Sequence, residues 1–228
     1  MKTVLLFLTL LTINATAKAA TYGPLHDTGV SEEYLVRLGT AAEADLLHRL
    51  DEPKNGKYFE GIISRLALIG DLKKPNPGVT SRLRKFVDRQ TECQNEVPEA
   101  KVFAVIAALK TIGQRGGNDD LNYLNRWISS NDLTDRVNCH FRGSTVKKTR
   151  YHFREAAVLG IGLSGTKGAH DRLLTIRRNL PKVEYPGNFV GAVDNALFDN
   201  ERIQKGGIEA VYGDDISRIK QKQGEGRK

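Results

Sequence analysis

Helical periodicity that stops at glycine constrains the fold of this chain more than any other feature. Apolar residues recur every three or four positions and then end on glycine, as in Leu66-Ala67-Leu68-Ile69-Gly70 and Leu109-Lys110-Thr111-Ile112-Gly113. This spacing is typical of amphipathic helices with a glycine at the C-terminal end. Strand signals are nearly absent, because no segment alternates apolar and polar residues over six positions. The sequence therefore predicts an all-α fold.

Each expected helix has its own start and stop signals. A capping box, Thr40-Ala41-Ala42-Glu43, begins one helix and Pro53 closes it. Apolar stripes predict further helices through 62–69, 83–87, 102–112 and 121–128, and over 150–164, 169–179, 188–199 and 201–212. The last segment, 213–228, is polar and rich in Gly and Lys. It is expected to be a flexible tail, with a short helix over 214–222 as the alternative.

The expected helices recur in pairs. A third near-copy of the glycine-ended segment, Ile161-Gly162-Leu163-Ser164-Gly165, begins 52 residues after the second, which begins 43 residues after the first. A loop-rich insertion at 131–149 accounts for the excess of nine residues. Helix pairs that repeat every 40–47 residues or so are typical of α-solenoids. A non-repeating helical bundle with chance glycine caps is the alternative.

This pattern resembles HEAT repeats, the helix-hairpin units of the armadillo-like superhelices. The resemblance is carried by the Leu-x-x-Ile-Gly endings at 66–70 and 109–113, and by Ala156-Ala157-Val158-Leu159-Gly160 at the start of the third unit. The Asp that often follows the glycine is present as Asp71 but not in the later units, and the usual Pro early in the second helix is missing.

The resemblance covers residues 57–212 and implies a short α-solenoid of about three to four helix hairpins. The segment 27–52 would then be an N-terminal helical cap, within one domain at 27–212. Solenoids of this family mostly present a curved binding surface, so the resemblance implies a binding protein but names no activity.

The first residues carry the pattern of an export signal. Lys2 is followed by the apolar stretch Val4 to Ile13 and by the small-x-small site Ala17-Lys18-Ala19. The apolar stretch is shorter than the roughly 20 residues of a membrane-spanning helix. We therefore expect a signal peptide at 1–19, cleaved after Ala19, with Ala17 as the alternative site. A buried N-terminal helix is the competing interpretation. The mature chain is expected in the periplasm or secreted, with no transmembrane segment.

Two cysteines, Cys93 and Cys139, lie in expected loops. An even count in an exported chain predicts a disulfide between them. Two free thiols, a catalytic cysteine or a metal site that uses Cys139 and His140 are the alternatives. Adjacent residues in an extended loop cannot easily chelate one ion, and the chain has no Cys-x-x-Cys motif. We expect no metal and no cofactor.

Positive charge is concentrated in one stretch of a chain whose formal net charge is +8. Eleven Lys and Arg stand between Arg136 and Lys182, against only Glu155 and Asp171. Arg150 and Arg154 are four residues apart on one helix and could clamp a phosphate or a carboxylate. A solvated face whose arginines pair with neighbouring acids is the alternative. The candidate binding residues are Arg142, Lys147, Lys148, Arg150, Arg154, Arg172, Arg177 and Arg178.

No catalytic motif stands out. The chain lacks a Gly-x-Ser-x-Gly elbow and a phosphate loop, and Gly160-Ile161-Gly162-x-x-Gly165 ends a helix where a dinucleotide fingerprint would begin one. We therefore expect an exported, non-enzymatic helical-repeat scaffold whose partner is a protein or an anionic envelope polymer. The leader argues against a nucleic-acid partner. The alternative is an enzyme of unknown class on the same frame, acting on an anionic cell-envelope substrate.

Overall fold

The computed structural model describes residues 27–129 and 132–225, so the expected signal peptide at 1–19 lies outside the described residues. Within these ranges the chain is mostly helical with two short strands, which confirms the predicted all-α class. The helices are α1 (Glu32–Leu38), α2 (Ala42–Arg49), α3 (Phe59–Ala67), α4 (Pro77–Thr91), α5 (Glu99–Arg115), α6 (Asn118–Ser129), α7 (Val146–Leu163), α8 (Lys167–Arg178), α9 (Pro186–Gly206) and α10 (Glu209–Glu225). The strands are β1 (Cys93–Glu96) and β2 (Val137–His140).

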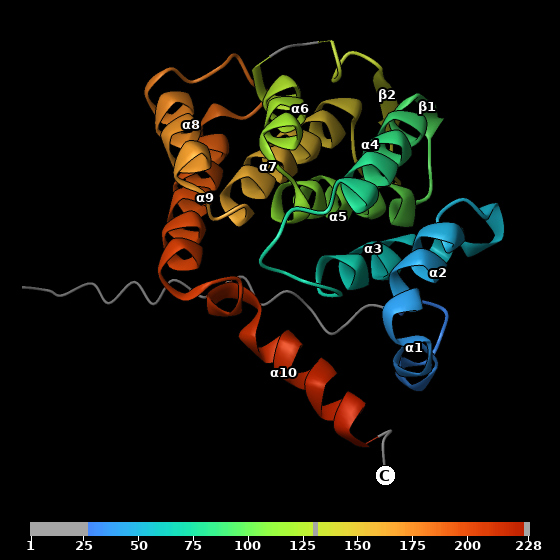
Figure 1. Cartoon of the computed structure of the whole chain (residues 1–228). Coiled ribbons are helices and arrows are strands. Elements are labelled where there is room, and N and C mark those ends of the chain that lie inside the picture. Colours follow the sequence, from blue (N-terminus) through green and yellow to red (C-terminus); the bar gives the residue numbers. More distant parts are fainter. Residues whose placement is uncertain (1–26, 130–131, 226–228) are drawn as a thin grey trace, which may run out of the picture.

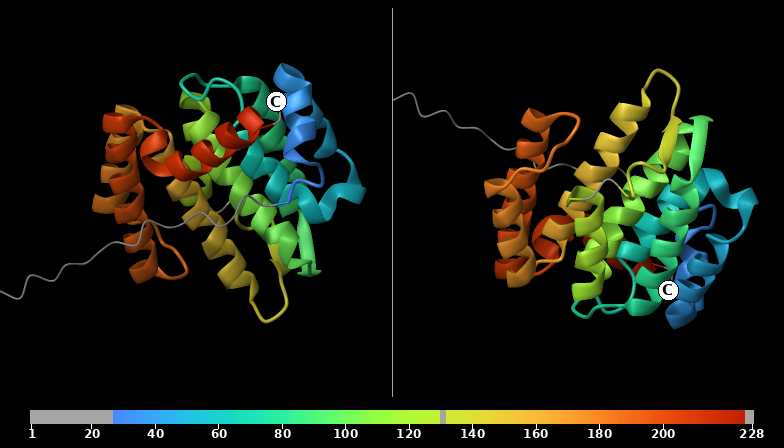
Figure 2. Two further views of the ribbon diagram at one scale, coloured as in Figure 1. Left: turned by 90° about the horizontal axis from the view of Figure 1, so that it is seen from below. Right: turned by 90° about the horizontal axis from the view of Figure 1, so that it is seen from above.

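Successive helices form two layers (Figure 1). In the first layer α3, α5, α7 and α9 lie side by side in chain order, and α4, α6 and α8 pack behind it on α5, α7 and α9. At one end of the layers α2 packs on α3. The chain then turns back: α10 leaves α9 and crosses the molecule to α1, as the left view of Figure 2 shows.

The core is one contiguous cluster of buried side chains that runs from Leu35 in α1 to Ala196 in α9. Aromatic rings meet edge to face within it, and the Trp127 and Phe153 rings, 6.0 Å apart between centroids, join α6 to α7. The shared core makes each helix pair dependent on its neighbours. None of the helices in the described ranges combines the length and the apolar content that crossing a bilayer requires.

The glycines of the repeated segments have two different roles. Gly70 and Gly165 have φ of +80° and +61°, which L side chains rarely adopt, and both follow the end of a helix. Gly113 instead lies inside α5, where a Cβ would come within 1.9 Å of the Gly160 carbonyl oxygen in α7. The expected helix end at Gly113 is therefore wrong. This glycine lets two helices approach closely.

The expected capping box at the start of α2 is also wrong. Residues Gly39–Ala41 form a 3₁₀ turn that joins α1 directly to α2, so Thr40 has no free helix start to cap. The Glu43 carboxylate is engaged elsewhere: the Asn76 amide donates to both of its oxygens, at 3.0 and 2.9 Å. The tertiary partner prevails because a charge-assisted contact is stronger than a solvated cap.

The C-terminal segment differs from the flexible tail expected at 213–228. The structure places it in α10 as far as Glu225, and Ile216 and Ile219 are 7 % and 4 % exposed. The alternative, a short helix over 214–222, agrees with the structure more closely. Two buried isoleucines in a polar segment provide the reason, because burial stabilises a helix that propensity alone would leave frayed.

Candidate functional site

The insertion before α7 is fastened by the predicted disulfide. Cys93 in β1 and Cys139 in β2 are bonded, with Cα atoms 5.3 Å apart. The strands are parallel, with Cys93 opposite Val137 and Asn95 opposite Cys139. The disulfide closes a loop across a sequence separation of 46, which stabilises the fold by about 4 kcal/mol in the chain-entropy account. The insertion is thereby held against the segment that precedes α5.

Arg154, half of the expected clamp, points into the protein and is 3 % exposed. Its guanidinium donates to the Ile128 carbonyl at 2.8 Å and to Thr134 Oγ1 at 2.9 Å, and its Nε lies 3.3 Å from a Glu184 carboxylate oxygen. Burial lowers the pKa of Arg154, and the Glu184 carboxylate opposes that shift. Because these partners already surround the guanidinium, Arg154 is corrected from a ligand-binding residue to a structural one.

Arg150 also turns toward the protein. Its Nε donates to the Val137 carbonyl at 2.9 Å, and its Nη2 donates to Asn138 Oδ1 at 3.0 Å. These bonds hold β2 against α7, because the forked guanidinium satisfies two acceptors of the insertion at once. Arg150 and Arg154 therefore serve separate contacts, and the expected clamp does not form.

Two basic residues of α8 pair with side chains of neighbouring helices, as in the alternative to a binding face. Arg172 donates to Asn122 Oδ1 of α6 at 2.7 Å, and Arg177 donates to Asp194 of α9 at the same distance. Arg178 is exposed. The first two arginines therefore link α8 to the helices on either side of it, at exposed positions where such pairs contribute little.

Three expected binding residues remain exposed around the start of α7. We name Arg142, Lys147 and Lys148 the basic tip. Across residues 27–129 and 132–225, no carboxylate lies within ion-pair distance of any of the three. The Lys147 ammonium lies 5.3 Å from the centre of the Tyr185 ring. In both views of Figure 2 the yellow loop before α7 projects at the edge of the molecule.

The basic tip occupies an unfavourable place for positive charge. Lys147 and Lys148 are in the first turn of α7, which contains no acidic residue. Thr145 caps this turn, since its Oγ1 accepts from the Lys148 backbone N–H at 3.2 Å. A helix N-terminus carries partial positive charge, so each lysine there costs about 0.3–1 kcal/mol. A bound anion would remove that penalty.

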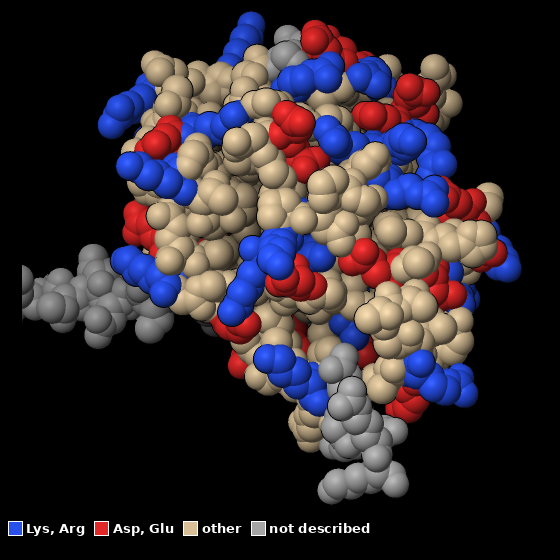
Figure 3. Space-filling model, in the orientation of Figure 1, with Lys and Arg blue, Asp and Glu red and all other residues tan. Residues whose placement is uncertain are grey.

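Charge on one face of the molecule is mixed in sign. On the face shown in Figure 3, lysine and arginine are interspersed with aspartate and glutamate. Asp51, for example, accepts from Arg82 at 2.7 Å and from Arg89 at 3.0 Å. The basic tip differs from this face, because its side chains form no ion pair with a carboxylate of the described residues.

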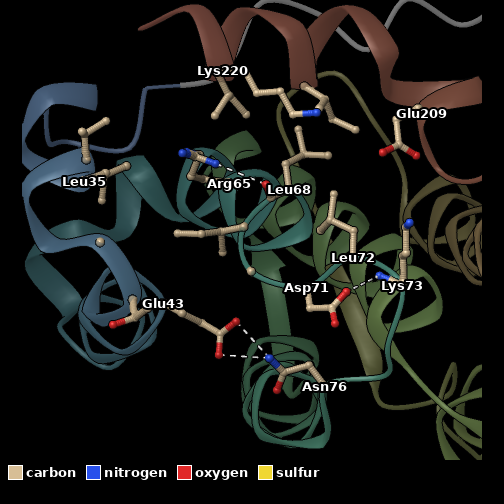
Figure 4. Close-up of a pocket in the computed structure, with 17 residues that line it drawn as sticks. Leu35, Glu43, Arg65, Leu68, Asp71, Leu72, Lys73, Asn76, Glu209 and Lys220 are labelled. Carbon is tan, nitrogen blue, oxygen red and sulfur yellow. Dashed lines mark hydrogen bonds between the residues drawn. The ribbon is translucent and has the colours of Figure 1, made fainter. Parts of the chain in front are cut away.

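A pocket of about 760 Å³ lies between α1, the segment that follows α3, and α10 (Figure 4). Its apolar lining comes from both sides, with Leu35, Leu68 and Leu72 opposite Ile216 and Ile219. Charged residues also line it: Glu43, Arg65, Asp71, Lys73, Glu209 and Lys220. Sequence reasoning missed this pocket, because its walls are about 150 residues apart in the chain and the only local signal was the isoleucine pair in a polar segment.

The body side of the pocket is held by buried ionic contacts. Arg65 is 3 % exposed and donates to both carboxylate oxygens of Glu32, at 3.1 and 3.2 Å. Arg115 lies 3.7 Å from the Glu43 carboxylate and donates to the Asp71 carbonyl at 3.0 Å. Burial lowers the pKa of Arg115, which Glu43 and Asp71 oppose. These contacts tie α1 and α2 to α3 and α5.

A third group of polar side chains lies on α7. The Tyr151 hydroxyl donates to one Glu155 carboxylate oxygen at 3.2 Å, and His152 Nδ1 lies 3.4 Å from the other. Burial raises the pKa of Tyr151. The carboxylate thus orients the imidazole, as in a catalytic dyad. In the described part of the chain, no three or more His, Cys, Asp or Glu gather as metal ligands would.

Comparison of the chain with protein-family models, with curated proteins and with solved structures finds no match. The functional argument therefore depends on the basic tip, the pocket and the α7 polar group themselves.

Proposed function

We propose that the chain is an exported, non-enzymatic scaffold of HEAT-like helix hairpins that binds an anionic partner at the basic tip. The side-by-side order of α3, α5, α7 and α9, with α4, α6 and α8 packed behind them on α5, α7 and α9, supports the solenoid, and α1 and α2 would be its N-terminal cap. A stacked array of this kind offers long surfaces for binding. The ligand itself is argued from the site, because fold does not imply function.

The expected location outside the cytoplasm has two supports. The first is the leader pattern at 1–19, and the second is the bonded pair Cys93 and Cys139, since disulfides persist in oxidising compartments. We propose cleavage after Ala19 and residence in the periplasm or the extracellular space. Sequencing the N-terminus of the protein purified from the host envelope or medium should give Ala20 as the first residue. A chain that retains Met1 would contradict export.

The observation that carries the binding proposal is the position of Lys147 and Lys148. They destabilise the helix on which they stand, and no acidic side chain in the described residues compensates them. An anionic group at the tip would meet the free N–H groups of the first turn and the positive charge of the neighbouring lysines. Carboxylates of an acidic protein segment and phosphates of an envelope polymer share this chemistry.

Charge reversal of the basic tip tests the proposal. The double variant Lys147→Glu/Lys148→Glu should lose retention on immobilised polyglutamate and on a polyphosphate polymer, and the unmodified chain should lose it only as salt rises. The matched control is Lys74→Glu/Lys85→Glu, which changes the net charge equally at exposed positions elsewhere. An equal loss of retention in both variants would show that retention depends on net charge alone, which would contradict a binding site at the tip.

A second candidate is an enzyme on the same frame that acts on an anionic envelope substrate. The observation that favours it is the His152–Glu155 contact, since a carboxylate-oriented imidazole is the usual general base. Purified protein incubated with envelope polymers should then release products, and His152→Asn should abolish this turnover. Turnover that persists in His152→Asn would remove this candidate.

A further inference from the structure

The end of the chain covers a hollow that it does not fill. Beyond Tyr212, α10 runs past the pocket toward α1, and Ile216 and Ile219 line the pocket without closing it (Figure 4). The space of about 760 Å³ between the two sides of the pocket is open to solvent, so α10 spans a groove and does not close it as a packed interior would. We name the body side of this pocket, lined by Leu35, Val36, Leu68, Ile69 and Leu72, the α10 groove.

The segment that covers the α10 groove has few buried side chains. Among its described side chains at 213–221, Ile216 and Ile219 are the buried ones. Ile216 belongs to a small apolar cluster with Ile208, Tyr212 and Leu163, separate from the main core. Segments with few buried contacts open at low free energy while the core stays folded.

A hinge precedes this segment. Tyr212 departs from helical geometry, with φ −112° and ψ 18°, and Gly213 follows it. The part of α10 before the hinge is fixed separately, because Arg202 of α9 donates to the Ala210 carbonyl. A rotation at Tyr212 and Gly213 would therefore release 213–225 while Ile208 and Tyr212 stay in place.

We propose that the α10 groove is a docking site for an amphipathic helix of a partner protein, and that residues 213–225 occupy it when the partner is absent. The own-chain helix defines the chemistry of the occupant: two aliphatic side chains three residues apart, followed by a lysine, as in Ile216, Ile219 and Lys220. This is the helix-in-groove mode, in which residues on one helix face fill an apolar groove. The rim carries acidic Glu43 and Asp71 as well as basic Arg65 and Lys73, and Arg65 is already paired with Glu32, so Lys220 has acidic groups in the same pocket.

The unfilled space specifies the partner further. A helix with a larger apolar residue at the position of Ile219 would bury more apolar surface without displacing the groove. The partner is thus expected to outcompete 213–225, because the segment of this chain leaves the pocket partly empty. While residues 213–225 occupy the groove, the partner cannot bind. The apparent affinity for the partner is therefore the intrinsic affinity multiplied by the fraction of molecules in which the groove is open.

Peptide binding to the full chain tests this proposal. The probe is a fluorescent synthetic peptide with the sequence of residues 207–225. The variant Ile216→Asp/Ile219→Asp releases the segment from the groove, so it should bind the probe about tenfold more tightly than the unmodified chain does. A probe with the same two substitutions is the control and should not bind. A probe with Ile219→Phe should bind about threefold to tenfold more tightly than the native probe.

Three results would overturn the proposal. A variant that keeps its circular dichroism spectrum yet does not bind the probe would show that the groove takes no helix. Equal affinity in variant and unmodified chain would show that 213–225 is no competitor. A dimer of the unmodified chain that dissociates in Ile216→Asp/Ile219→Asp would show that the groove serves self-assembly.

Hydrogen exchange is an independent test. It is measured on the unmodified chain, so it does not depend on whether a variant folds. Amides of 214–221 should exchange at least about tenfold faster than those of α5 and α7, since the segment opens separately from the core. Exchange of 214–221 as slow as that of α5 would mean that the segment is part of the core, which contradicts a displaceable occupant.

Discussion

At the scale of single residues, buried side chains that satisfy several partners have the largest consequences. Arg154 extends from α7 to the carbonyl of Ile128 in α6 and to Glu184 before α9, so one side chain links three parts of the chain. Gly113 has the opposite role, because the absence of a side chain allows α5 to touch the Gly160 backbone of α7. In both cases the effect comes from what lies opposite the residue in the folded protein.

Replacing Arg154→Met should lower the free energy of unfolding by about 3 kcal/mol, because Glu184 would be left as a buried charge without its partner. Urea denaturation followed by circular dichroism measures this loss. The double variant Arg154→Met/Glu184→Gln should recover part of it, since the orphaned charge is then gone. A single variant within about 0.5 kcal/mol of the unmodified protein would contradict the structural role.

Replacing Gly113→Ala should destabilise the protein by about 3 kcal/mol, since the new methyl group would overlap the Gly160 carbonyl and force α5 from α7. The control is Gly191→Ala in α9, where a Cβ meets nothing within 4 Å. That change should stabilise by about 0.5–1 kcal/mol through helix propensity. Thermal unfolding of the two variants should therefore shift in opposite directions, and parallel shifts would argue against the close approach.

At the scale of elements, α7 combines a structural and a functional requirement. Its inner positions carry the packing with α5, α6 and α9, and its arginines hold the disulfide-linked insertion. Its first turn, however, contains two lysines where an acidic residue would be more favourable. Residues that lower local stability are expected at functional sites, where binding and not stability selects the side chain.

The single change Lys148→Glu should therefore raise stability and weaken anion binding at once. The new carboxylate would complete a capping box with Thr145 and meet the positive end of α7, which raises the free energy of unfolding by about 0.5–1 kcal/mol. The control is Lys205→Glu in the last turn of α9, where the same reversal should be destabilising. Calorimetry checks both signs, and retention on polyglutamate checks the loss of binding.

At the scale of the whole molecule, stacking places charged groups of different helices close together. Asp199 of α9 interacts with Lys110 of α5 and with Arg202, and burial raises the pKa of Asp199 above its ordinary value of 3.8. A carboxyl whose pKa is higher in the folded state holds a proton that the unfolded chain has already released. Its contribution to stability therefore falls as pH rises through that window.

Replacing Asp199→Asn should remove this part of the pH dependence. Between the ordinary carboxyl pKa and the raised one, the stability of the unmodified protein relative to the variant should fall as pH rises, because only the unmodified protein contains the Asp199 carboxyl. Urea unfolding at a series of pH values between about 4 and 7 measures the difference. A variant with the same slope as the unmodified protein would show that Asp199 does not titrate in this range.

Part of the candidate site could be predicted from the sequence. The disulfide followed from the number of cysteines, and the concentration of basic residues around α7 followed from simple counting. The fate of each arginine could not be predicted, because Arg150 and Arg154 stand on one helical stripe yet meet carbonyls of different segments, Val137 in the insertion and Ile128 in α6. Those carbonyls are brought there by residues far away in the chain.

Helical periodicity was sufficient to predict that the chain is helical and where most helices run, because periodic burial and backbone hydrogen bonding are local properties of a segment. Three features became visible in the folded protein alone: Gly113 is a contact point, Glu43 pairs with Asn76 and Arg115, and 213–225 returns to α1 over an open pocket. Each of these depends on the surface that another segment presents. Such surfaces exist only after the helices have packed together.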